Sequence, residues 1–358
     1  MKKRFLSLTL VACMATALLA GCGGNPSEAN SPNGDNTSSG DDGKVYTLNI
    51  DFPNPETACG YKALVEWEAK VEEESNGRLD INIYSGGALG ALSDCVTNCQ
   101  SGVTDGFWSG VTIYPGVFPQ TEVMGLPMIG VTDHHVMNDI LNDMLANETW
   151  MQEEWSDFKV VALHSSQPCV ILSSKPVNDP LQDWKGQNLR LSNAYSADWF
   201  TNLGINPVSV GINDGYENIS KAVIDGGLFF LDQVESSALY EVIDNIWLGD
   251  TVYALNMFCL NKDKYEALPD DLKAIIDGSS QFFIDTIEQK FDEQEEYLMG
   301  KFEEYDVKLV EVPEDELATM KDATASSWQL WVDNMNKSGY DGQAILDCAL
   351  EYVAKYSN

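Results

Sequence analysis

Residues 185–210, KGQNLRLSNAYSADWFTNLGINPVSV, contain the pattern that decides the fold. Apolar and polar side chains alternate over 188–192, which is typical of a strand. Residues 197–203 have the apolar spacing of a helix, and 207–210 form a second β-rich run. A strand, a helix and another strand in succession make up the repeating unit of an α/β sheet.

The same alternation continues toward both ends of the chain. Strands are predicted at 45–52, 79–85, 107–110, 159–165, 169–174, 227–232 and 252–262, and helices at 61–74, 93–100, 134–147 and 216–224. This order predicts parallel sheets covered by helices on both faces. The chain is long enough for two such lobes rather than one core.

A long amphipathic stretch follows the last of these strands. From Leu272 onward, apolar residues recur every three or four positions for some thirty residues, ending near Phe302. One helix of this length would be longer than one small lobe and would brace two. The alternative is two helices that are broken at Asp277 and Gly278.

The first residues predict export and a lipid anchor. Residues 1–21 combine a positive start with an apolar run shorter than the ~20 residues of a membrane span, so we interpret them as a signal peptide. Leu19-Ala20-Gly21-Cys22 resembles a lipobox, which would make Cys22 the lipidated first residue. Residues 22–44 are rich in Gly, Ser, Asn and Asp and predict a flexible tether. The alternative is an ordinary secretory signal with a chance cysteine.

Composition excludes several classes of protein. The net charge of −35 argues against nucleic-acid partners, because phosphate backbones require clustered cations. No H-E-x-x-H, G-x-S-x-G, P-loop or C-x-x-C motif is present, and we expect no catalytic residue, cofactor or metal.

The histidines and cysteines are few. His134 and His135 follow Asp133 at a predicted helix start. Six cysteines lie beyond Cys22 without a disulfide framework, and we expect buried free thiols.

Arg190 is the most informative single residue. Only it and Arg78 remain as arginines after the signal segment, and Arg190 alternates with Leu189 and Leu191 near the end of a predicted strand. The carboxyl ends of strands in α/β lobes are where ligands bind, and a guanidinium matches a carboxylate with two parallel hydrogen bonds. The alternative is an ion pair with one of the chain's many Asp and Glu residues.

An ordered set of segments carries a family resemblance. These are GRLDINIYSGGALG (77–90), FP with GLPMIG (118–130), PLQDWKGQNLRLSN with LGINPVSVGINDGYENISKAVIDGG (180–227), and NKDKYEALPDDLK (261–273). Together they resemble the DctP-type substrate-binding proteins of TRAP transporters, across nearly the whole mature domain.

The resemblance implies a two-lobed α/β, periplasmic-binding-protein-like fold that closes on an organic acid. Lobe I would comprise 45–166 and 255–293, lobe II 167–254 and 294–358, and the long helix would span both. Arg190 would clamp the ligand carboxylate. The protein would be an extracytoplasmic monomer, anchored through Cys22, that delivers its ligand to the membrane subunits of a TRAP permease. An ABC-type or receptor-linked binding lipoprotein is the nearer alternative, and a secreted hydrolase is the more distant one.

Two departures from the family pattern bear on the ligand. Gly227, Leu228 and Phe229 replace a frequent Q-E-N run, and Cys169 stands where many members have a second arginine. A ligand with one carboxylate and an apolar body is therefore expected, rather than a C4-dicarboxylate or sialic acid. The candidate ligand-binding residues are Arg190, Trp108, Asn193, Ile212, Tyr216, Phe229, Asn256 and Cys169. Trp108 is equally well explained as a core residue, and at most one of Phe229 and Phe230 is expected to face the cleft.

Overall fold

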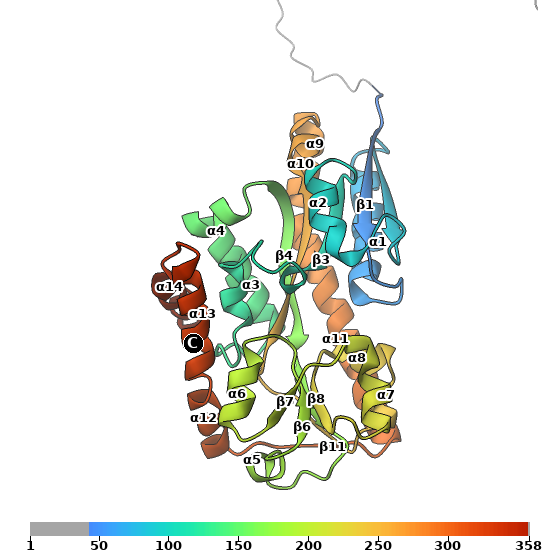
Figure 1. The fold of residues 1–358 in the computed structure, drawn as a ribbon. Helices are drawn as coiled ribbons and strands as arrows, with labels where there is room; N and C mark the ends of the chain where they lie inside the picture. Colours follow the sequence, from blue (N-terminus) through green and yellow to red (C-terminus); the bar gives the residue numbers. More distant parts are fainter. Residues whose placement is uncertain (1–42, 357–358) are drawn as a thin grey trace, which may run out of the picture. The chain divides into compact units, whose positions relative to one another are not determined.

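The computed structural model describes residues 43–356, which contain two β-sheets with helices packed against them (Figure 1). The predicted signal peptide 1–21, the lipidation of Cys22 and nearly all of the predicted tether 22–44 lie outside the described residues. Within the described part of the chain, no helix is both long and apolar enough to cross a membrane.

The first sheet has five strands in the order β2-β1-β3-β10-β4. Its strands are β1 (Tyr46–Phe52), β2 (Leu79–Ser85), β3 (Gly106–Gly110), β4 (Phe158–Pro168) and β10 (Tyr253–Asn261). The helices of this part of the chain are α1 (Cys59–Glu74), α2 (Cys95–Gln100), α3 (His134–Asn147), α4 (Thr149–Glu154) and α9 (Lys262–Glu266), together with the 3₁₀ turns η1 (Leu92–Asp94), η2 (Val111–Ile113) and η3 (Thr121–Gly125).

The second sheet has six strands in the order β11-β9-β5-β8-β6-β7. Its strands are β5 (Val170–Ser173), β6 (Asn188–Arg190), β7 (Asn206–Val208), β8 (Gly226–Phe229), β9 (Asn245–Trp247) and β11 (Lys308–Leu309). The helices between them are α5 (Pro180–Asp183), α6 (Ser196–Asn202), α7 (Gly215–Ser220) and α8 (Leu231–Ser236), with the 3₁₀ turns η4 (Ile212–Asp214) and η5 (Leu239–Glu241).

Both sheets are mixed, so the prediction of parallel sheets was wrong in this respect. β10 runs antiparallel to β3 and β4, and β5 runs antiparallel to β8 and β9. These are the strands that the chain forms just after it crosses from one sheet to the other. β4 passes into β5 across Cys169 alone, and β9 leads to β10 through residues 248–252. A strand that arrives from the other sheet enters its new sheet from the opposite end, and it therefore runs antiparallel to its neighbours.

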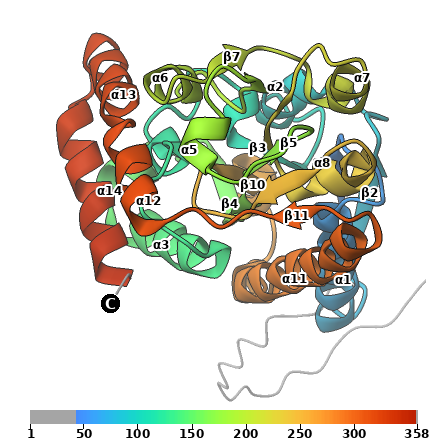
Figure 2. The ribbon, with the colours of Figure 1, turned by 90° about the horizontal axis from the view of Figure 1, so that it is seen from below.

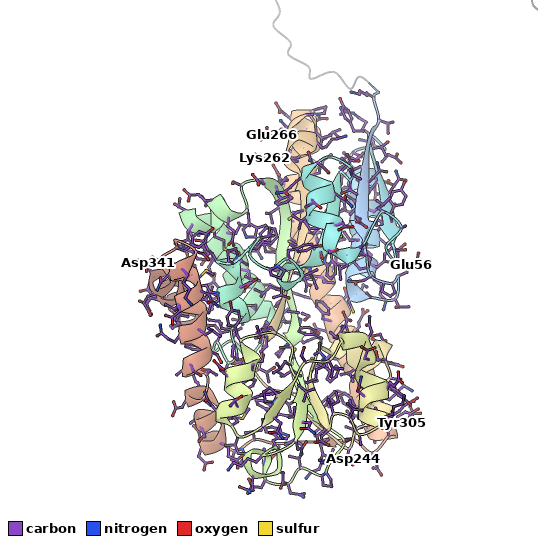
Figure 3. The ribbon with its side chains drawn as sticks, in the orientation of Figure 1. Glu56, Asp244, Lys262, Glu266, Tyr305 and Asp341 are labelled. Carbon is purple, nitrogen blue, oxygen red and sulfur yellow. The ribbon has the colours of Figure 1, made fainter. Side chains whose placement is uncertain are left out.

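The long amphipathic stretch forms two helices with almost no gap. α10 (Asp270–Gly278) and α11 (Ser280–Glu304) are separated by Ser279 only. Phe283 and Ile287 of α11 belong to the core of the first sheet, whereas Leu298 and Phe302 belong to a core cluster of the second sheet. Tyr305, just after α11, lies at the opposite end of the folded part from Lys262 and Glu266 (Figure 3). The prediction of a long helix that spans two lobes is thus confirmed.

The C-terminal helices lie along one side of both sheets (Figure 2). They are α12 (Glu314–Asp322), α13 (Ala325–Lys337) and α14 (Gly342–Tyr356). Trp331 of α13 and Ala349 of α14 lie in a core cluster with residues of α3 and η3, and α13 also contacts α6. Met320 of α12 packs into a core cluster of the second sheet. This packing differs from the assignment of the whole range 294–358 to lobe II, because the apolar faces of α13 and α14 cover α3 and η3.

The described cysteines are free thiols, as expected. Five are buried and one is half-buried: Cys59, Cys95, Cys99, Cys169, Cys259 and Cys348. Burial raises the pKa of the thiol of Cys259, which lies in β10. These residues therefore behave as small core side chains rather than as reactive groups.

Candidate functional site

Arg190 is the last residue of β6, in the middle of three parallel strands. It pairs with Val208 of β7 on one side and with Gly227 of β8 on the other. The carboxyl ends of the three strands therefore meet at the same edge of the sheet. A Cβ atom at Gly227, whose φ is +151°, would lie 2.4 Å from the backbone nitrogen of Arg190. The glycine thus allows β8 to approach β6 closely.

The guanidinium of Arg190 is buried and held by backbone carbonyls. The residue is 6% exposed, its Nε donates a hydrogen bond to the oxygen of Val210 at 3.1 Å, and its Nη1 donates to the oxygen of Leu228 at 2.6 Å. The ring of Phe229 lies beneath it, with its centroid 4.9 Å from the guanidinium carbon. Burial lowers the pKa of this guanidinium, because desolvation disfavours the charged form.

No carboxylate within residues 43–356 forms an ion pair with Arg190. The alternative was that Arg190 pairs with an Asp or Glu of the chain, and no such ion pair is found among the described residues. Two neutral carbonyl oxygens satisfy part of its hydrogen-bonding capacity but supply no negative charge. A buried cation in this state is costly, and an incoming anion would relieve that cost.

Cys169 and Phe229 lie next to Arg190. Cys169 is fully buried at the crossing between β4 and β5, and its polar neighbours are Arg190 and Ser192. Burial raises the pKa of its thiol, so Cys169 is neutral at physiological pH and does not balance the arginine. Phe229 is buried in a core cluster of the second sheet, while Phe230 is half-buried.

Two asparagines among the candidates are fixed by backbone contacts. Asn193 donates from Nδ2 to the oxygen of Gly125 at 3.4 Å, and its Oδ1 accepts from the backbone nitrogen of Ser196 at 3.0 Å. It thereby connects the loop after β6 to η3. Asn256 lies in β10 opposite Gly110, is 8% exposed, and donates to the oxygen of Ala254 at 3.2 Å.

The remaining candidates are not gathered around Arg190 by any contact in the structure. Trp108 is a core residue: its ring lies 5.1 Å from that of Phe52, and its Nε1 donates to Nε2 of His164 at 2.9 Å. Tyr216 is 36% exposed, and its hydroxyl donates to Glu241 at 3.0 Å. Ile212 is half-buried in η4.

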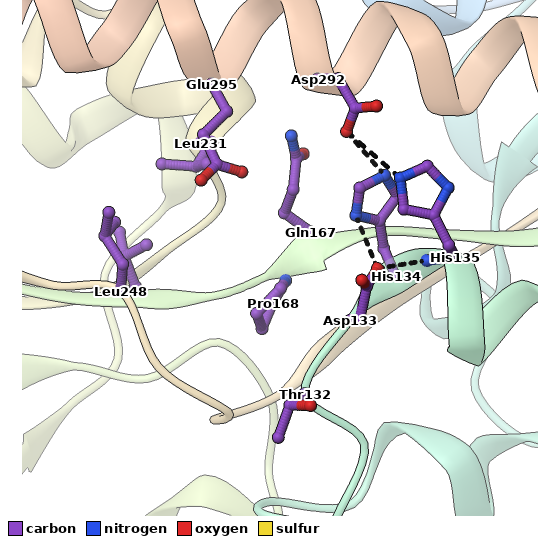
Figure 4. A pocket seen from close by; sticks show the side chains of 11 residues that line it. Thr132, Asp133, His134, His135, Gln167, Pro168, Leu231, Leu248, Asp292 and Glu295 are labelled. Atoms are coloured by element: carbon purple, nitrogen blue, oxygen red, sulfur yellow. Dashed lines mark hydrogen bonds and ion pairs between the residues drawn. The ribbon is translucent and has the colours of Figure 1, made fainter. Parts of the chain in front are cut away.

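A different cavity was missed by the sequence analysis. The histidine cavity has a volume of about 270 Å³ and is lined by Thr132, Asp133, His134, His135, Gln167, Pro168, Val170, Leu231, Leu248, Asp292 and Glu295 (Figure 4). A neighbouring apolar cavity of about 580 Å³ shares Thr132, Pro168 and Leu248 with it. Arg190 lines neither of these two cavities. The run of Asp133, His134 and His135 was the visible signal, but Asp292 is far away in the sequence.

Comparison with known proteins identifies the family. The family model described as bacterial extracellular solute-binding protein, family 7 (DctP), matches residues 53–334. The ectoine-binding periplasmic protein TeaA of Halomonas elongata is 20% identical over 279 residues, which are 76% of this chain and 81% of the relative.

Two solved structures share the fold. One is a TRAP solute-binding protein from a marine metagenome, specific for aromatic acid ligands and solved with metahydroxyphenylacetate. It is 25% identical, with a TM-score of 0.78 over 88% of this chain and 100% of that one. The other is a TRAP solute-binding protein of Rhodoferax ferrireducens in complex with benzoate. It is 24% identical, with a TM-score of 0.75 over 87% of this chain and 99% of that one.

The family match covers most of the described chain, and the two sheets joined by a long helix are the architecture of the solved relatives. These two findings establish the family. The chain belongs to family 7 of the bacterial extracellular solute-binding proteins, the binding proteins of TRAP transporters, and it is a binding protein rather than an enzyme.

Proposed function

We propose that this protein captures an organic acid with a single carboxylate and an apolar body, and that Arg190 is the counter-ion of that carboxylate. The observation that carries the proposal is the buried guanidinium without a carboxylate partner. Nη2 of Arg190 has no hydrogen-bond partner among the described residues, so it remains available to a ligand oxygen. A hydrogen bond of this charged type contributes ~1.5–3 kcal/mol net.

The surroundings of Arg190 favour an apolar ligand body. Cys169 is neutral and Phe229 is aromatic, so neither adds a second cation or an amide next to the arginine. Two relatives of the same fold bind aromatic acids, namely metahydroxyphenylacetate and benzoate. An aromatic or branched monocarboxylate is therefore the first ligand class to test.

Ligand entry requires the two lobes to separate, because Arg190 is only 6% exposed. The chain crosses between the sheets at Cys169 and at residues 248–252, and α11 packs on the cores of both. These three connections are the natural hinge. Ligand binding would favour the closed form, which the membrane subunits of a TRAP permease would then recognise.

The N-terminal sequence supports placement at the outer face of the cell membrane. We infer that residues 1–21 are removed, that Cys22 is lipidated and that 22–44 serve as the tether. Labelling of cells with palmitate tests this inference: the protein should incorporate the label, and Cys22→Ser should not. Equal labelling of the two proteins would contradict the lipid anchor.

The ligand assignment is tested by thermal unfolding against a library of organic acids. A ligand at ~100 times its Kd adds ~2.7 kcal/mol to the stability of the folded state, which raises Tm by several degrees in a chain of this size. We expect aromatic monocarboxylates to raise Tm and Arg190→Ala to abolish the effect while the protein remains folded.

Arg78→Ala is the matched control, because Arg78 forms an ion pair with Asp271 far from the site. It should retain the full ligand-induced shift. A carboxylate that stabilises the Arg190→Ala variant as strongly as the unsubstituted protein would refute the role of Arg190. Stabilisation by neutral or zwitterionic solutes alone would refute the ligand class.

A further inference from the structure

The histidine cavity lies where α3 begins beside the middle of α11 (Figure 4). Asp133 caps α3, since its Oδ1 accepts a hydrogen bond from the backbone nitrogen of His135 at 2.8 Å. This cap fixes Asp133, His134 and His135 around the first turn. Asp292 projects from α11 toward the two imidazole rings, as Figure 4 shows.

The donor atoms of these residues converge. Nε2 of His135 lies 3.3 Å, and Nε2 of His134 lies 3.6 Å, from the same oxygen, Oδ1 of Asp292. Asp133, His134 and His135 each offer one ligand atom, and these atoms all lie within 4.8 Å of one another. Donors around a tetrahedral zinc ion, at ~2.0–2.1 Å from the metal, are ~3.3 Å apart. The two separations from Oδ1 of Asp292, 3.3 and 3.6 Å, are close to this value.

His134 has an unsatisfied nitrogen in the cavity. The residue is 5% exposed, and its Nε2 has no hydrogen-bond partner within residues 43–356. Buried polar atoms in folded proteins are almost always satisfied, and one that is not calls for an explanation such as an unseen ion. The nearest charged group to this nitrogen is the carboxylate of Asp292, which is itself a metal-ligating group.

His135 is oriented as a metal ligand usually is. Its Nδ1 lies 2.9 Å from Oε2 of Glu288, and Oε1 of Glu288 accepts a hydrogen bond from Nδ2 of Asn138 at 2.8 Å. Oε2 of Glu288 accepts a hydrogen bond from Nδ1–H of His135, and in the neutral imidazole this tautomer leaves the lone pair on Nε2, the nitrogen that faces Asp292. This carboxylate–histidine arrangement is typical of the outer shell of zinc sites.

We propose that His134, His135 and Asp292, with Asp133 beside them, bind a divalent transition-metal ion of the zinc type. Two imidazoles with carboxylates select zinc-like ions over calcium and magnesium, which prefer sets made of oxygen atoms alone. The site is separate from Arg190, which does not line this cavity. The ion joins the start of α3 to the middle of α11, next to the crossing at Gln167 and Pro168.

The test is a titration of the purified, chelator-treated protein with Co²⁺ in a large excess of Mg²⁺, which occupies weak sites on this acidic surface. We expect one equivalent of Co²⁺ to bind with the visible absorption of a four-coordinate nitrogen and oxygen site, and one equivalent of Zn²⁺ to displace it. His135→Ala and Asp292→Asn should each weaken binding at least tenfold. Glu288→Gln should weaken it by ~10- to 100-fold through the orientation of His135.

Asp285→Asn is the matched control, because Asp285 lies on the same helix and contacts Gln281 rather than the cavity. It should bind Co²⁺ with unchanged affinity. Circular dichroism in chelator identifies the variants that remain folded, and Glu288→Gln replaces any that do not. Absence of stoichiometric binding, unchanged affinity in the folded variants, or an intense thiolate absorption band would each overturn the proposal.

Discussion

A single buried positive charge stands out at the scale of residues. Arg190 donates hydrogen bonds to the backbone carbonyls of Val210 and Leu228, and no carboxylate within residues 43–356 pairs with it. The carbonyl dipoles orient the guanidinium without neutralising it, so its charge is available to the carboxylate of the proposed ligand. The ~1.5–3 kcal/mol of one charged hydrogen bond is a large part of the ~8 kcal/mol that corresponds to a micromolar Kd.

Gly227 determines where that charge lies. A Cβ atom at this position would be 2.4 Å from the nitrogen and 2.5 Å from the Cβ of Arg190, so any side chain would push β6 and β8 apart. The carbonyl of Leu228, the next residue, is the acceptor that holds Nη1 of Arg190. Gly227 and Arg190 therefore act together: the glycine lets the strands pack closely, and this packing positions the guanidinium.

The junction between α10 and α11 is tied to α1 at the scale of elements. Ser279 is fully buried, and its hydroxyl accepts a hydrogen bond from Nε1 of Trp67 at 2.7 Å while it donates to the oxygen of Ile276 at 2.7 Å. Gly278 has open space where its Cβ would be, so its lack of a side chain is not required by packing. Ser279 is therefore the residue that connects this junction to the neighbouring helix.

Ser279→Ala should destabilise the protein. Trp67 is also fully buried, so its indole N–H would lose its acceptor, at a cost of ~1–3 kcal/mol. The better helix propensity of alanine recovers at most ~0.7 kcal/mol, so the loss prevails. Urea denaturation of the two proteins measures the difference.

Trp67→Phe provides the background that isolates this contact. In that background the indole N–H is absent, so Ser279→Ala should cost less than it does in the unsubstituted protein. Equal costs in the two backgrounds would show that the hydrogen bond between Trp67 and Ser279 does not stabilise the fold.

Elements with a clear repeating pattern were predictable from sequence, and so were the short strands β6 and β7, but other short strands were not. The alternation in 79–85 and the apolar spacing in 134–147 gave the bounds of β2 and α3 correctly. β9 and β11, which have three and two residues, were missed. The direction of β5 and β10 was also missed, since it depends on where the chain crosses between sheets.

The candidate site was likewise predictable only where a local sequence pattern marks it. Arg190 was identifiable because it alternates with leucines in a strand, but its carbonyl partners lie 20 and 38 residues away. Trp108 lies in the middle of β3 and Tyr216 in the first turn of α7, and sequence alone could not orient either side chain. Trp108 turned out to face the core and Tyr216 the surface. The pairing of His134 and His135 with Asp292 depends on packing between α3 and α11, which no local pattern encodes.

Acidity is the dominant property at the scale of the whole molecule. The net charge of −35 favours solubility but opposes compaction, and this repulsion grows as carboxyl groups ionise. Among the described carboxyl groups with raised pKa values, Glu122 and Asp250 are shifted to about 7. Burial, followed by the negative charge of Glu154, raises the pKa of Glu122 to about 7. Burial likewise raises the pKa of Asp250 to about 7, although Lys321 opposes the shift.

These shifts predict that stability falls as pH rises. Between the ordinary acidic range and pH 7, the folded protein keeps protons on Glu122 and Asp250 that the unfolded chain has released. The folded state therefore binds more protons, and the free energy of unfolding decreases with pH across this window. Carboxyl groups with lowered pKa values, such as Asp143 and Asp183, act in the opposite sense, but only below the ordinary pKa of 3.8. We expect Tm to be higher at pH 5 than at pH 8.

Glu122→Gln and Asp250→Asn should each remove part of this pH dependence. At pH 8 they replace a buried carboxylate by a neutral amide of similar shape, so Tm should exceed that of the unsubstituted protein. At pH 5, where both carboxyl groups are protonated in the folded state, the difference should be much smaller, and it ends only below their ordinary pKa values. Glu266→Gln, at an exposed position in α9, is the control and should leave the pH profile of Tm unchanged. If all three variants follow the unsubstituted protein at both pH values, the fall in stability comes from the diffuse acidic charge rather than from these two buried groups.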